Sequence, residues 1–156
     1  TLGEFKVTGF HYVLPTPWNT NNELPEDELA KRLKHIEKQV DRRTIFVTHG
    51  PPKGVLDRLA NGLLAGSESI FKLVKDKQPV FHIFGHIHEA FGDAKIGDTI
   101  CCNASCLWSD WLLRGYIIDT QTRCIEEIEK AISFDDFRRI YDKHLANRSS
   151  YLALRR

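Results

Sequence analysis

The sequence predicts an α/β fold, built on parallel strands joined by helices into a mixed sheet. Two runs of β-branched and aromatic residues, Thr44–Thr48 and 80–84, lack polar alternation and match strands that are covered on both faces. An amphipathic helical segment lies between them. A strand, helix, strand order gives a parallel pair with a right-handed crossover, so the ends of both strands should meet at one edge of a sheet.

The first quarter of the chain predicts two short strands and a helix. Residues 4–8 and 10–14 have strand composition, and a connection rich in proline and asparagine follows them. Pro25 and the acidic residues after it are typical of a helix start, and this helix should run to about Gln39. Its apolar positions recur at helical spacing: Leu29, Leu33, Ile36 and Val40.

A second helix and two hairpins are predicted downstream. Ser67 is a typical N-cap residue, and the helix that it opens should end before Pro79. Turn residues divide the following region into paired strands, which we expect to extend a second sheet. The predicted hairpins are 91–95 with 99–103, and 116–119 with 124–128.

The chain is predicted to form one domain over residues 1–132 and a terminal helix and tail over residues 133–156. Ser133 and Asp136 have the spacing of a capping-box variant, which places the last helix at 134 to about 146. The basic stretch after that helix has no clear pattern. No internal repeat or low-complexity tract interrupts the chain.

Composition excludes several classes of function. A formal net charge of +1 provides no basic excess for general nucleic-acid binding, and no apolar run approaches the roughly 20 residues that a membrane-spanning helix needs. The cysteines have no paired Cys-x-x-Cys spacing, so free thiols and a cytoplasmic location are predicted. A structural zinc site remains an alternative for the four cysteines: Cys101, Cys102, Cys106 and Cys124.

Three histidines follow the two buried strands directly. His49 ends the first strand, and His86 and His88 come after Gly85 at the end of the second. In an extended segment, residues two apart project to the same side, roughly 6 to 7 Å from each other. Two imidazoles placed in this way can each reach a different ion of a dinuclear site, whose metals lie about 3.5 to 4 Å apart. Metal binding is therefore predicted for His49, His86 and His88, whereas the other histidines are expected to pack or bond locally.

The motifs around these histidines resemble a known family. His49-Gly50-Pro51-Pro52, together with Gly85-His86-Ile87-His88, is similar to the last two motifs of the calcineurin-like metallophosphoesterase superfamily. Within it, the pattern is most similar to the class of metallophosphoesterase-domain proteins. The likeness runs, with gaps, from about residue 5 to residue 118.

The resemblance implies a fold, a reaction and a ligand set. The family fold is a four-layer α/β/β/α sandwich, of which residues 1–132 would be the C-terminal portion. Two divalent ions, of Mn, Fe, Zn or Ni, would activate water to hydrolyse a phosphodiester or phosphomonoester. His49 and His86 would bind one ion and His88 the other.

Asp142-Lys143-His144 matches one of the family's other ligand motifs as text, but it lies near the wrong end of the chain and on a predicted helix, where residues two apart do not face one way. The motifs that supply the family's other ligands are otherwise missing from this sequence. They are an Asp-x-His, a Gly-Asp-x-x-Asp and a Gly-Asn-His motif. Two close dications need an anionic bridge, which neutral imidazoles do not supply. We therefore expect no catalytic residue in this segment, and we expect it to be the later part of a longer enzyme. The alternative is a non-catalytic module that retains the fold for protein interaction.

Overall fold

A computed structural model describes residues 3–107, 112–133, 135–136 and 138–139 of the chain. It divides into two compact units, residues 1–105 and residues 106–156. The first unit contains both histidine-bearing loops.

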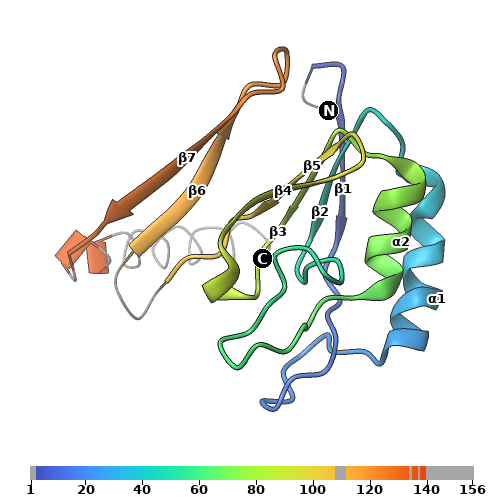
Figure 1. Ribbon diagram of the computed structural model, residues 1–156, viewed down its shortest axis with the longest axis horizontal. Helices are drawn as coiled ribbons and strands as arrows, with labels where there is room; N and C mark the ends of the chain where they lie inside the picture. Colours follow the sequence, from blue (N-terminus) through green and yellow to red (C-terminus); the bar gives the residue numbers. More distant parts are fainter. Residues whose placement is uncertain (1–2, 108–111, 134, 137, 140–156) are drawn as a thin grey trace, which may run out of the picture. The chain divides into compact units, whose positions relative to one another are not determined.

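The first unit is a mixed five-stranded sheet (Figure 1). Its four parallel strands lie side by side, and the fifth strand closes one edge in the antiparallel sense. The carboxyl ends of the parallel strands therefore meet at one edge. In sheet order the strands are β1 (Lys6–Phe10), β2 (Thr44–Thr48), β3 (Phe81–Phe84), β5 (Thr99–Asn103) and β4 (Gly92–Ile96).

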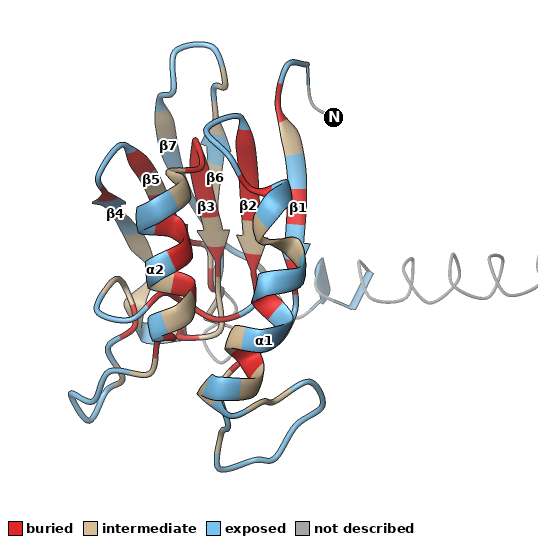
Figure 2. Ribbon diagram, turned by 90° about the vertical axis from the view of Figure 1, so that its right-hand side faces the viewer, coloured by how far each residue is buried: buried red, intermediate tan, exposed pale blue. Residues whose placement is uncertain are grey.

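Two helices cover the same face of this sheet (Figures 1 and 2). They are α1 (Glu26–Ile36), which continues into the 3-10 turn η1 (Glu37–Gln39), and α2 (Glu68–Lys77). Leu29 of α1 and Val74 of α2 are completely buried and pack with Phe46 of β2. The α/β fold and the two helices that the apolar spacing predicted are thereby confirmed.

The start of the chain differs from its prediction. One strand, β1, replaces the two that were expected. In the second expected strand, residues 10–14, Val13 forms an isolated bridge to Glu23. The main chain of Val13 both donates to Asn22 and accepts from Leu24, so this part pairs with a neighbouring loop instead of extending the sheet.

The placement of the first hairpin was wrong. Its strands, β4 and β5, were expected in a second sheet, but β5 inserts beside β3 in the first sheet, with Phe81 opposite Ile100. The burial of β5 agrees with this position, because its consecutive residues Cys101 and Cys102, which point to opposite faces, are both completely buried. A strand that buries both faces belongs in the middle of a sheet, next to another buried strand.

The second unit contains a two-stranded antiparallel sheet of β6 (Leu112–Ile118) and β7 (Ile125–Ala131). Most of β7 is exposed. Ser133 accepts from the backbone of Asp136 at 3.1 Å, as the predicted cap requires. The rest of the predicted last helix lies largely outside the described residues. Over the described part of the chain, no helix combines the length and apolar character needed to cross a membrane.

Candidate metal centre

Two of the three predicted ligands meet at the carboxyl edge of the sheet. β2 and β3 are parallel neighbours, so His49, just after β2, lies beside the turn that follows β3. The backbone amide of Gly85 donates to the carbonyl of His49 at 3.2 Å, which joins the two strand ends. The rings of His49 and His86 are 4.8 Å apart between centroids and inclined at 57°.

The backbone between His86 and His88 is not the extended segment that was expected. His86 has φ +74°, and the amide of Ile87 donates to the carbonyl of Gly85 at 2.9 Å, which closes a three-residue turn. His88 then begins the 3-10 turn η2 (His88–Ala90). His86 and His88 therefore do not lie two apart in an extended strand, and the ligand role of His88 stays a prediction.

The surroundings of His86 favour its neutral form. Burial lowers the pKa of His86 below the usual value, and the nearby His49 and His88 lower it further, while Glu23 acts in the opposite direction. A neutral imidazole has the free lone pair that metal coordination requires.

Glu23 is an acidic group near the histidines that the sequence reading did not single out. Its carboxylate accepts from the backbone amides and hydroxyls of Thr16 and Thr20, at distances of 2.5 to 2.8 Å. These hydrogen bonds, those of Thr16 first, hold its pKa at about 2. The loop that precedes α1 therefore presents a permanent negative charge on the histidine side of the sheet.

The long loop between His49 and α2 is held from inside by Asp57. This side chain is 1% exposed, and its carboxylate accepts from the amides of Gly54 and Gly66, each at 2.9 Å. Farther along the loop, the amide of Ala60 donates to Glu89 in η2 at 2.8 Å. The His49 loop and the His88 turn are thus connected to each other.

Asn103 stands at the end of β5, the parallel strand beside β3, and it too was missed as a side chain. It is completely buried. Its amide group donates to the carbonyl of Ile87 at 2.9 Å and to that of Leu56 at 3.2 Å, and its oxygen accepts from Ser105 at 3.0 Å. A polar residue at the end of a buried strand was the available signal.

His49 and His86 bring two imidazoles together, a ligand type that suits divalent metals, but a full donor set is not assembled. Among the residues that the structure describes, no three His, Cys, Asp or Glu side chains converge closely enough to hold an ion. No group of this kind, and so no zinc site, forms at the four cysteines of the described part of the chain, and burial raises the pKa of Cys101 to about 12, which disfavours the thiolate that binds zinc.

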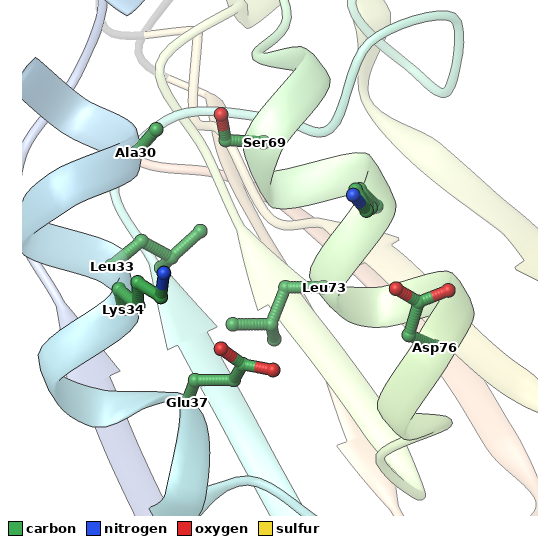
Figure 3. Close-up of a pocket in the computed structure, with 8 residues that line it drawn as sticks. Ala30, Leu33, Lys34, Glu37, Ser69, Leu73 and Asp76 are labelled. Atoms are coloured by element: carbon green, nitrogen blue, oxygen red, sulfur yellow. The ribbon is translucent and has the colours of Figure 1, made fainter. Parts of the chain in front are cut away.

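A hollow lies between the two helices, away from this edge. It is a surface groove of about 310 Å³, in which Leu33 of α1 and Leu73 of α2 are surrounded by Lys34, Glu37 and Asp76 (Figure 3). Its charges are mixed and it contains no cluster of metal-ligating side chains. The carboxyl edge of the sheet, where ligands of open α/β sheets bind, is the better candidate.

Comparison with known proteins shows the family of the chain. The family described as "Metallophosphoesterase, calcineurin superfamily" matches residues 15–113. A UPF0046 protein of Caenorhabditis elegans is 38% identical over 77 residues, which is 49% of this chain and 26% of that protein. Human metallophosphoesterase domain-containing protein 1 is 34% identical over 110 residues, covering 65% of this chain and 32% of the human one. The chain thus spans about a third or less of the length of these relatives.

Two solved structures share the fold. One crystal structure superposes with a TM-score of 0.62 at 23% identity, over 83% of this chain and 50% of its own. Another, of a protein from Thermus thermophilus, gives 0.54 at 20% identity, over 82% of this chain and 54% of its own. Both likenesses concern the fold alone.

Proposed function

Because the chain belongs to the calcineurin superfamily of metallophosphoesterases, we propose that it provides the histidine ligands of a metal-dependent phosphoesterase site. His49, His86 and His88 would bind divalent ions, and the substrate would be a phosphodiester or phosphomonoester. Membership of the family supports a phosphoesterase type of function. The proposed residues go further and rest on the arrangement of the histidines.

The observation that carries the proposal is the pairing of His49 with His86. Two rings from adjacent strand ends lie 4.8 Å apart, and burial lowers the pKa of one of them, which favours its neutral form. Two cations would repel each other at such a distance, whereas two neutral imidazoles can share one ion. A hydrogen-bonded surface pair would not require the strained backbone of His86.

Each part of this edge has a role in the proposed site. A bound divalent ion would polarise phosphate oxygens and lower the pKa of water. His49 and His86 would hold it, while the Asp57 loop sets the position of the chain after His49. The negative charge of Glu23 favours cations at this edge. The anionic ligands would come from outside this sequence, because it has no Gly-Asp-x-x-Asp motif and its Asp-x-His match, Asp142-Lys143-His144, lies near the wrong end of the chain.

Metal titration tests the ligand assignment. Zn²⁺, Co²⁺ and Ni²⁺ are titrated calorimetrically into the wild-type protein and into His49→Ala, His86→Ala and His35→Ala. We expect each of the first two variants to lose at least about tenfold in affinity. His35 is exposed on α1 and serves as the matched control, which should bind like the wild type. Equal affinity in all four proteins would refute the metal centre.

Hydrolysis separates the enzyme from the non-catalytic module. The native protein that contains this sequence is assayed with bis(p-nitrophenyl) phosphate in the presence of Mn²⁺, beside its His86→Ala variant. We expect turnover that the variant lacks. Metal binding without turnover of this or any other phosphate ester would favour the module.

A further inference from the structure

Two segments at the histidine edge hold unusual backbone conformations. His86 has φ +74° and Leu56 has φ +52°, values that residues other than glycine rarely adopt. Such conformations are unfavourable and persist only where the surroundings hold them. The contacts that hold these two segments therefore decide where the histidines lie.

One side chain contacts both segments. The amide group of Asn103 donates one hydrogen bond to the carbonyl of Leu56 itself and another to the carbonyl of Ile87, the residue between His86 and His88. Its two amide hydrogens can satisfy these two carbonyls at once, and its oxygen is occupied by the amide of Ser105. No other residue type of this size offers two donors and an acceptor in one plane.

The sheet register sets the position of Asn103. It is opposite Phe84 in the parallel β3–β5 pair and opposite Gly92 in the antiparallel pair with β4, and it is completely buried. A strand in the interior of a sheet is a rigid base. The side chain of Asn103 therefore fixes the turn that follows β3 relative to β5.

The geometry points to Asn103 as a positioning residue for the metal-binding histidines: it holds the peptide between His86 and His88, and ties that peptide to the His49–α2 loop. This inference rests on the proposed metal centre and deepens it. Asn103 does not touch the ion. It acts through the Ile87 carbonyl, and residues of this kind behind metal ligands change affinity by about 10- to 100-fold when replaced.

The test compares two amides in the full chain. Asn103→Leu keeps the branched shape but removes both donors and the oxygen that accepts from the amide of Ser105. Gln78→Leu is the matched control, because the Gln78 amide also donates to backbone carbonyls, those of Val74, Lys75 and Ile96, but at the opposite edge of the sheet. We expect Asn103→Leu to bind Zn²⁺ about 10- to 100-fold more weakly than the wild type, and Gln78→Leu to match the wild type. Circular dichroism and denaturation record the stability of both variants.

Other outcomes have distinct meanings. If His49→Ala weakens Zn²⁺ binding and Asn103→Leu does not, the positioning role is overturned while the metal centre stands. If His49→Ala has no effect, the metal centre itself fails. Equal loss of affinity in Asn103→Leu and Gln78→Leu would mean that the loss follows general destabilisation, which also overturns the role.

A measurement on the wild-type protein covers the case in which Asn103→Leu does not fold. In a ¹⁵N-labelled sample titrated with Zn²⁺, the side-chain NH₂ signals of Asn103 should shift with the same midpoint as the backbone amide of His49. The NH₂ signals of Gln78 should stay in place. Unchanged Asn103 signals beside a shifting His49 amide would overturn the inference.

Discussion

At the scale of single residues, His82 shows how a buried histidine is kept neutral. It is completely buried in β3, and its ring stacks on Phe46 at 5.2 Å between centroids. The hydroxyl of Thr48 donates to the carbonyl of Gly50, so it accepts from Nε2 of His82 at 2.9 Å. Nδ1 has no hydrogen-bond partner among the described residues. The sequence predicted that His82 packs or bonds locally, and this is confirmed.

Burial lowers the pKa of His82 to about 3, against 6.5 for an exposed imidazole. The unfolded chain therefore binds more protons between these values, and stability falls as the pH drops below 6.5, by up to about 1.4 kcal/mol per pH unit. We expect His82→Phe, which keeps a ring against Phe46, to be less sensitive to pH. Urea denaturation at pH 7.5 and 5.5 with a chelator present measures the difference, and the same pH dependence in both proteins would contradict this account.

At the scale of elements, the first turn of α2 joins the two helices. Ser67 is 2% exposed, and its hydroxyl accepts from the amide of Ile70 at 3.2 Å, as the predicted N-cap requires. The same hydroxyl donates to Glu26 of α1 at 2.9 Å, and Glu26 also accepts from the amide of Ser69. The cap could be predicted from the sequence, but the link to α1 could not, because Glu26 is far away along the chain.

Ser67→Ala should remove the cap and the link together. We expect a loss of about 1 to 2 kcal/mol in the free energy of unfolding, since a buried hydroxyl with two hydrogen bonds is deleted. Ser69→Ala is the control: only the backbone of Ser69 contacts Glu26, so its stability should stay close to that of the wild type. Chemical denaturation compares the three proteins. Similar losses in both variants would show that the hydroxyl of Ser67 has no special role.

The helices and β2 were predictable because their signals are local. Apolar spacing, an N-cap residue and a run of apolar residues predicted the bounds of these elements to within a few residues. The position of β5 was not predictable in this way. A strand that buries both faces can join any buried sheet, so the pairing of β5 with β3 depends on tertiary packing and not on a local pattern.

At the scale of the whole molecule, the two units differ in how much apolar surface their strands bury. The first unit has a sheet of five strands under two helices, and buried residues recur along its strands (Figure 2). The second has two described strands, and Ile117 and Ile128 are 56% and 46% exposed. The family match ends at residue 113, inside β6. Two strands alone are only marginally stable.

Hydrogen exchange should therefore separate the units. We expect the amides of β7 to exchange at least about tenfold faster than those of β2 and β3, because β7 buries little apolar surface. Exchange followed by mass spectrometry at neutral pH measures both in one sample. Comparable protection of β7 and β2 would mean that an additional surface covers the hairpin.

The sequence by itself determined the α/β class, the two helices, the strands that lead to His49 and His86, and the family, because hydrophobic spacing, turn residues and the histidine motifs are short-range patterns. Only the tertiary structure decided that β5 lies beside β3, that His86 and Leu56 hold strained backbones, and that Asn103 contacts the turn after β3 while Glu23 lies near His86. These side chains are dozens of residues apart in the chain. They come near the histidines because parallel strands end at one edge, and that depends on strand order, which no local pattern contains.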